Sequence, residues 1–168
     1  METKPQTSGE YFKVLQIIFY ALVAGQVMFG FVALLLIQMA GFNAELQDLG
    51  NILLIIVCVF VFSGYLGSRI FFQVRMKSAR ARNSLAEKMD DYRGAVIIRF
   101  ALLEGPSMLS IIAYLITGLW AFLIIAAFII VIFFALRPTP DKAINDLQLN
   151  LNEEQIILNP NSPITSER

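Results

Sequence analysis

Long runs of apolar residues, separated by short polar segments, dominate this chain. Four runs stand out, at residues 14–40, 49–68, 95–117 and 119–136. A helix needs about 20 apolar residues to cross a bilayer core of ~30 Å, and each run is near or above that length. The pattern predicts an all-α integral membrane protein. Its four transmembrane helices are expected to form two hairpins.

The basic residues set the expected orientation of these helices. The link at 41–48 and the reversal around Gly118 contain no lysine or arginine, whereas the connector at 69–94 is strongly basic. Four helices place all 13 basic residues on one side of the membrane. Basic loops stay in the cytoplasm, so both termini are expected inside. The expected location is a cell membrane, the inner membrane of a bacterium, with the chain crossing it several times.

The connector and the tail carry helix signals of their own. Apolar residues at Leu85, Met89, Tyr92 and Val96 recur at helical spacing, so the basic connector is expected to be helical. Its arginines either contact lipid headgroups or simply set topology. We divide the chain into a transmembrane domain at 1–137 and a cytoplasmic polar tail at 138–168. Thr139-Pro140 and residues 152–155 resemble helix starts, and residues 159–168 are expected to be disordered.

The amino-acid composition excludes several classes of function. The chain is 57% hydrophobic and 15% charged, with a mean hydropathy of +0.67. It has no histidine and one cysteine, Cys58, so it lacks the commonest metal ligand and the usual general base. No nucleophile–base pair, nucleotide loop or nucleic-acid motif is present. We expect no enzyme activity, metal or cofactor. The expected partners are the lipid bilayer and a second copy or another membrane protein.

Glu104 is the residue that calls for an explanation, because it is the only acidic residue inside the four predicted spans. A charge in hydrocarbon costs about 2.5–3.5 kcal/mol on insertion scales. Pro106 lacks an N–H, so the carbonyl of Leu102 loses its helical partner. Together with the hydroxyl of Ser107, these oxygens form a candidate proton or cation site. The alternative is a structural kink in which Glu104 is tied by hydrogen bonds to other helices.

Small and amide residues predict where the helices pack. Ser63, Gly64 and Gly67 lie on the second predicted helix at spacings that let backbones approach closely. Gly25 takes a similar place on the first predicted helix. Gln26 lies near the middle of that helix, where its side chain could form a hydrogen bond to another helix. We interpret all five as helix-packing residues.

The stretch from Arg93 to Gly105, RGAVIIRFALLEG, resembles the ion-carrying helix of the rotary ATPase proteolipid, the c subunit. In that family a polar cytoplasmic loop leads into an R-G-A-type start, and an A-L-x-E segment presents the ion-binding carboxylate. The resemblance covers about 50 of the 168 residues, the second and third predicted helices. It implies that Glu104 stands in the carboxylate's position.

Two functions follow from the sequence. The first is a small, non-enzymatic, c-subunit-like membrane protein whose Glu104 binds a proton or a cation. The second is a structural or accessory membrane protein without an ion site, in which Glu104 serves helix packing and the tail or the basic connector binds a partner.

Overall fold

The computed structural model describes residues 6–40 and 49–164, and the described chain is helical almost throughout. Its helices are α1 (Ser8–Ala40), α2 (Gly50–Arg80), α3 (Leu85–Thr117), α4 (Trp120–Ala135), α5 (Pro140–Leu147) and α6 (Leu151–Leu158). They form two compact units. The polar unit comprises Met1–Phe19, Arg69–Arg99 and Arg137–Arg168. The apolar unit comprises Tyr20–Ser68 and Phe100–Leu136.

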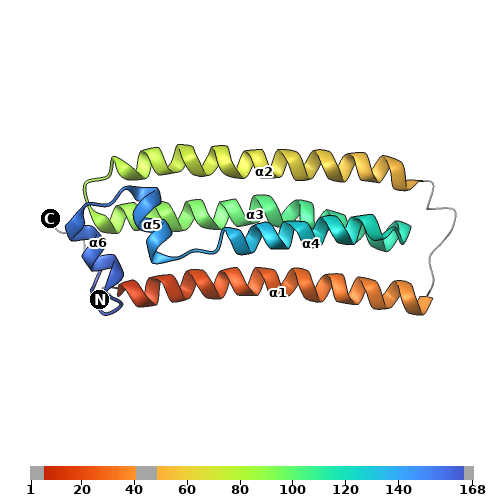
Figure 1. Cartoon of the computed structure of the whole chain (residues 1–168), viewed down its shortest axis with the longest axis horizontal. Helices are drawn as coiled ribbons and strands as arrows, with labels where there is room; N and C mark the ends of the chain where they lie inside the picture. Colours follow the sequence, from red (N-terminus) through yellow and green to blue (C-terminus); the bar gives the residue numbers. More distant parts are fainter. Residues whose placement is uncertain (1–5, 41–48, 165–168) are drawn as a thin grey trace, which may run out of the picture. The chain divides into compact units, whose positions relative to one another are not determined.

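Within the apolar unit, segments of α1, α2, α3 and α4 lie side by side (Figure 1). Their shared core includes Ala33, Val57, Ile111, Tyr114 and Phe122. Three helices, α1, α2 and α3, are long and apolar enough to cross a membrane. A fourth span is reached if α4 and α5 count as one broken helix. The expected all-α fold is therefore confirmed for the described residues, and three of its helices could span a membrane.

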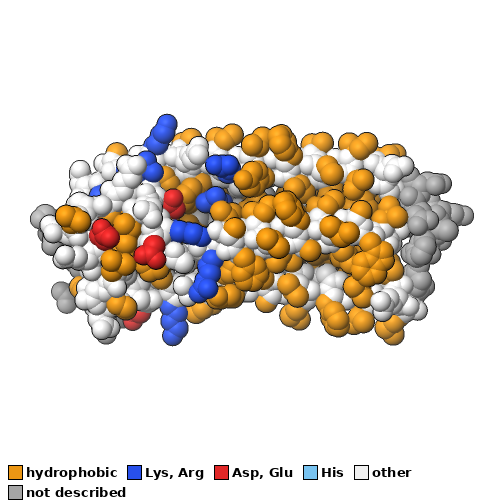
Figure 2. Space-filling view, in the orientation of Figure 1, with side chains coloured by type: hydrophobic (Ala, Val, Ile, Leu, Met, Phe, Trp, Pro, Cys, Tyr) orange, Lys and Arg blue, Asp and Glu red, His pale blue; other side chains and the backbone are white. Residues whose placement is uncertain are grey.

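The outer surface of the apolar unit is itself apolar. Large hydrophobic side chains such as Met28, Ile55, Phe62 and Ile124 are each exposed over about two thirds of their surface. Figure 2 shows orange side chains over these helices, whereas the lysines, arginines and acids in view belong to the polar unit. Soluble proteins rarely expose apolar surface on this scale, and hydrocarbon is the solvent that suits it.

The reversal between α3 and α4 depends on Gly118. Its φ of 68° lies in the left-handed region, where a side chain is strained. Its N–H donates to the Tyr114 carbonyl over 2.7 Å. The Thr117 hydroxyl donates to the Ala113 carbonyl and accepts from the Leu119 N–H. The expected tight turn at Gly118 is confirmed.

Three helices continue beyond their apolar runs into the polar unit. The sequence placed their ends where hydrophobicity stops, at residues 14, 68 and 95, but α1 begins at Ser8, α2 ends at Arg80 and α3 begins at Leu85. Lysine, arginine and glutamate are good helix formers, so the switch to charged residues does not end a helix. Leu85, Met89, Tyr92 and Val96 are all buried, which confirms the helical connector.

The C-terminal segment folds onto the rest of the polar unit. Thr139 caps α5 as expected, with Pro140 in the first turn. The capping box of α6 joins Asn150 and Glu153, two residues before the expected start. Residues 159–164, which we expected to be disordered, are ordered instead. The carbonyls of Pro160 and Ser162 accept from the Gly9 and Ser8 N–H groups, which the start of α1 leaves without helical partners.

Side-chain contacts also join distant parts of the polar unit. Tyr11 Oη donates to the Met89 carbonyl over 2.6 Å. Ser8 Oγ donates to the Ile157 carbonyl over 2.6 Å. Lys88 and Glu153 form an ion pair at 2.7 Å that is largely shielded from water. The two units divide the chain after Leu136, close to the expected boundary after residue 137, but the polar unit also includes Met1–Phe19 and Arg69–Arg99.

Candidate functional site

The centre of α3 contains the proline and the free carbonyl that the sequence predicted. Pro106 lies inside the helix, where its missing N–H releases the carbonyl of Leu102. Gly64 of α2 packs directly against this point. A Cβ at Gly64 would lie 2.7 Å from the Leu102 carbonyl oxygen and 2.9 Å from Pro106 Cγ. The Leu102 carbonyl therefore faces α2 and is closely covered by its backbone.

Glu104 lies next to this contact. Its side chain is partly exposed, and it has no hydrogen bond or ion pair among residues 6–40 and 49–164. In the described part of the apolar unit it is also the only residue with an ionisable acidic or basic group of the Asp, Glu, Lys or Arg type. The structure thus gives Glu104 no partner of the kind that a purely structural glutamate needs.

Two other polar side chains of the apolar unit are buried without a partner in the described structure. Gln26 and Ser107 are fully buried, and neither the Gln26 amide nor Ser107 Oγ has a hydrogen-bond partner in the described structure. Buried polar groups are normally paired, and an unpaired one costs about 1–3 kcal/mol. At Gln26 and Ser107 the apolar unit therefore differs from an ordinary protein interior, in which buried polar groups have hydrogen-bond partners.

The contact between α1 and α3 places these two side chains at one level. A Cβ at Gly30 would lie 3.8 Å from Ile111 Cδ1, so these positions meet across the helix pair. The two helices run in the same direction (Figure 1). Gln26 precedes Gly30 by four residues, and Ser107 precedes Ile111 by four, so both lie one turn below that contact. Glu104 precedes Ser107 by three residues, so it lies within the adjacent turn of α3, further from that contact.

The other hydroxyls of α3 have structural roles. Ser110 Oγ donates to the Phe122 carbonyl over 2.6 Å and so joins α3 to α4. Thr117 is used in the turn at Gly118. The Tyr114 ring lies 6.0 Å from that of Trp120, between ring centres. Ser110 and Thr117 of α3 are therefore engaged in hydrogen bonds, whereas Ser107 and Glu104 have no hydrogen-bond partner in the described structure.

The predicted packing residues fall into different environments. Gly64 lies in the close contact described above, whereas a Cβ at Gly67 or Gly25 would meet nothing within 4 Å. Ser63 is exposed, and its Oγ donates back to the Phe60 carbonyl of its own helix. Helical spacing predicts packing at all of these positions equally. Only the position of a neighbouring helix decides which of them is in close contact.

The chemistry available at this level is that of a carboxyl, a hydroxyl and a primary amide. Among the described residues no group of three or more histidine, cysteine, aspartate or glutamate side chains comes together. A protonated carboxyl donates one hydrogen bond and accepts others, so it matches the donor and acceptor capacity of Gln26 and Ser107. The arrangement suits holding a proton better than it suits coordinating a bare cation.

Sequence reasoning missed a second cluster, in the polar unit. Arg69, Arg99 and Asp146 line one cavity, although they come from three different helices. Burial raises the pKa of the Asp146 carboxyl, while Arg99, Arg80 and Lys142 oppose that shift. The one signal in the sequence was Arg99, a charge inside an otherwise apolar run.

Comparison of the chain with protein-family models, with curated proteins and with solved structures finds no match.

Proposed function

We propose that this chain is a four-span membrane protein with both termini in the cytoplasm, and that Glu104 exchanges a proton within the apolar unit. The resemblance of the stretch from Arg93 to Gly105 to the rotary ATPase proteolipid supports the same role for this carboxyl. In this proposal the chain is a non-enzymatic, c-subunit-like protein of a bacterial inner membrane.

One observation carries the proposal: the unpaired side chains of Gln26 and Ser107 lie at one level, within a helical turn of Glu104. Polar groups without partners are especially costly where water is excluded. A protonated Glu104 can donate to one of these groups and accept from the other. Its proton removes the cost of a charge in the apolar unit. After release of the proton, the carboxylate could still accept from the Ser107 hydroxyl and the Gln26 NH2, but the Gln26 carbonyl oxygen would lose its donor.

A bare cation is the weaker occupant. The predicted ligand set was Glu104, Ser107 and the Leu102 carbonyl, and hard cations use six or more oxygen ligands. Gly64 covers the Leu102 carbonyl, so this oxygen is directed toward α2. We therefore replace Leu102 by Gln26 in the proposed site, and we leave sodium as an outcome of the test.

Labelling with a hydrophobic carbodiimide tests the site, because this reagent attacks the acid form of a carboxyl. We expect Glu104 to react, labelling to fall as pH rises, and Glu104→Gln to abolish the adduct. Gln26→Leu and Ser107→Ala should move the pH at which labelling falls. Gln38→Leu and Ser63→Ala make the same chemical changes at exposed positions, so they should leave that pH unchanged.

The outcomes separate the possible roles. Protection by sodium would identify a cation site, and labelling that ignores sodium would identify a proton site. If Glu104 never reacts at any pH while Glu104→Leu destabilises the protein, the site is absent. The accessory role, with Glu104 serving helix packing, would then replace it.

Orientation has its own test. Four spans place the connector and both termini on one side, as the distribution of basic residues predicts. Cys58 is exposed, so labelling needs a Cys58→Ser background. In that background Asn43→Cys, which lies outside the described residues, should react with an impermeant thiol reagent from outside, and Ser84→Cys should not. The reverse pattern, or reaction at both positions, would contradict the topology.

A further inference from the structure

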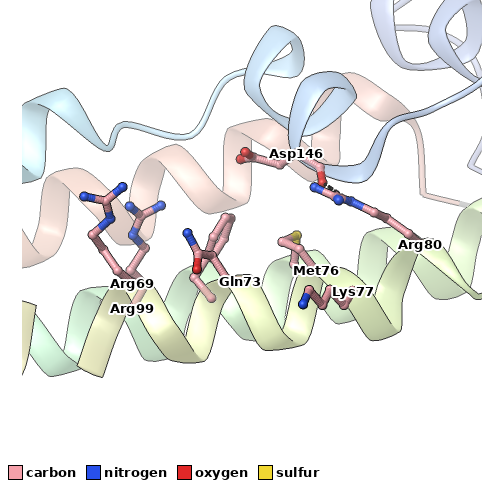
Figure 3. Close-up of a pocket in the computed structure, with 8 residues that line it drawn as sticks. Arg69, Gln73, Met76, Lys77, Arg80, Arg99 and Asp146 are labelled. Carbon is pink, nitrogen blue, oxygen red and sulfur yellow. Dashed lines mark hydrogen bonds between the residues drawn. The ribbon is translucent and has the colours of Figure 1, made fainter. Parts of the chain in front are cut away.

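A cavity of about 420 Å³ lies within the polar unit, between α2, the start of α3 and α5. Figure 3 shows its lining side chains. Four of them are cationic and one is acidic. The lining residues are Arg69, Phe72, Gln73, Met76, Lys77, Arg80, Arg99 and Asp146.

The floor of the cavity is apolar and fixes one of its guanidinium groups. Phe72 and Met76 are buried. The Arg99 guanidinium carbon lies 4.5 Å from the centre of the Phe72 ring, which is the geometry of a cation–π contact. Stacking of this kind holds the planar guanidinium in one orientation.

Asp146 and Arg80 form the opposite side of the cavity. Arg80 Nε donates to the backbone carbonyl of Asp146 over 2.8 Å, so it does not use the carboxylate for this bond. The carboxyl of Asp146 points toward the side on which the Arg69 and Arg99 guanidiniums lie (Figure 3). Burial raises the pKa of this carboxyl, while the charges of Arg99, Arg80 and Lys142 lower it.

Net charge in the cavity therefore favours an anion. Arg69, Lys77, Arg80 and Arg99 carry four positive charges against one carboxyl. Arginine matches phosphate well because its planar fork donates two parallel hydrogen bonds. The volume is at the small end for ligand pockets, which suits a headgroup and not a whole lipid.

The position of the two arginines along the chain points to the membrane surface. Arg69 directly follows Ser68, the last residue of the apolar unit in α2, and Arg99 is the last residue of the polar unit in α3, directly before the apolar unit resumes at Phe100. Side chains at these ends of spanning helices meet the headgroup layer, where anionic lipids concentrate basic residues. Phosphate groups are the abundant anions of that layer.

We propose that this cavity binds the phosphate group of an anionic phospholipid headgroup. Arg69 and Arg99 hold the phosphate oxygens, Lys77 and Arg80 add positive charge, and Asp146 accepts a hydrogen bond from a headgroup hydroxyl. A lipid with a polyol headgroup, such as phosphatidylglycerol, presents both features. This site is separate from Glu104 and stands whether or not Glu104 exchanges a proton.

The test compares two double variants of the whole protein that remove the same charge. Arg69→Gln/Lys77→Gln alters the cavity at two exposed side chains, so it should fold. Arg75→Gln/Arg82→Gln is the matched control, because both arginines lie in the same basic segment, are exposed, and pair with Asp91 outside the cavity. Binding of short-chain phosphatidylglycerol and of short-chain phosphatidylcholine to protein in neutral detergent is measured by thermal shift and native mass spectrometry.

We expect phosphatidylglycerol to bind and phosphatidylcholine to bind far more weakly. The cavity variant should lose about tenfold in affinity, the order expected for lost charge-assisted hydrogen bonds, and the control should keep the wild-type affinity. Equal losses in both variants would mean a diffuse basic surface and would overturn the site. Failure of phosphatidylglycerol to bind the wild-type protein would overturn it as well.

A further arm identifies the source of the phosphate. Glycerol 3-phosphate and inorganic phosphate are added as competitors. If neither displaces the lipid at concentrations a hundredfold above it, the lipid assignment is supported. If either displaces it at equal concentration and shows the same dependence on Arg69 and Lys77, a free phosphate compound is the ligand, and the lipid source is overturned.

Discussion

The polar and apolar units treat their buried polar side chains differently. In the polar unit, Ser8 and Tyr11 donate to carbonyls far along the chain, and Lys88 pairs with Glu153. The apolar unit makes one comparable link from Ser110 to the Phe122 carbonyl, but it leaves Gln26 and Ser107 without partners in the described structure. The hydrogen bonds and the ion pair of the polar unit thus join segments that are far apart in the chain, which stabilises that unit.

The difference shows where function is to be sought. A buried polar group without a partner costs about 1–3 kcal/mol, more than the net contribution of a typical hydrogen bond. Such groups persist only where another requirement retains them. In the apolar unit they share a level one helical turn from Glu104 along α3, while packing elsewhere in the unit follows ordinary rules of apolar contact and close backbone approach. We infer that the requirement is the proton of Glu104.

The largest expected effect tests the close backbone approach in the apolar unit. Gly64→Leu should destabilise by up to about 3 kcal/mol, because even its Cβ would meet the Leu102 carbonyl and Pro106. Gly67→Leu should be near neutral, since that position faces open space. The midpoint of unfolding in a detergent titration with SDS measures both. Equal effects would mean that α2 does not approach α3 at Gly64.

The next effect compares matched hydrogen bonds in the two units. Tyr11→Phe removes the bond to the Met89 carbonyl but keeps the ring near Arg93, and should cost about 1 kcal/mol. Ser110→Ala removes the bond to the Phe122 carbonyl and should cost about 0.6 kcal/mol, the average for bonds between membrane helices. Both are measured by the same unfolding titration. A larger loss for Ser110→Ala would reverse the comparison.

The smallest effect concerns pH and Asp146. Burial raises the pKa of this carboxyl above its ordinary value, so the folded protein holds the proton more tightly than the unfolded chain. The contribution of the protonated Asp146 carboxyl to the free energy of unfolding is fully present below about pH 3.9, the pKa in the unfolded chain. This contribution is lost as pH rises through the pKa in the folded protein. Asp146→Asn should remove this loss, so its stability relative to wild type should increase between pH 4 and pH 7.

The control for this measurement is Asp141→Asn, because Asp141 is exposed at the start of the same helix. It should show no such relative increase. Unfolding midpoints are compared across the pH range for all three proteins. A decrease in the relative stability of Asp146→Asn with rising pH would show that the surrounding cations outweigh burial at this carboxyl.

The amino-acid sequence alone determined the helices and the residue of interest. Apolar runs of bilayer length predict spanning helices because hydrocarbon leaves the backbone no other partner. The helices α1, α2 and α3 are long and apolar enough to cross a membrane. Gly118 and Thr139 act locally, so their turn and cap were also predictable. Glu104 stood out because an acid within an apolar run is rare and costly.

Tertiary structure decided everything that depends on a neighbour. Gly64 and Gly67 lie on the same helix, and the sequence predicts helix packing at both equally. Only the position of Pro106 shows that Gly64 makes the close contact and Gly67 does not. Gln26 and Ser107 share a level because Gly30 meets Ile111. Arg69, Arg99 and Asp146 are far apart in the chain and meet only in the folded polar unit. Periodicity fixes which face of a helix a residue occupies, whereas packing fixes what that face meets.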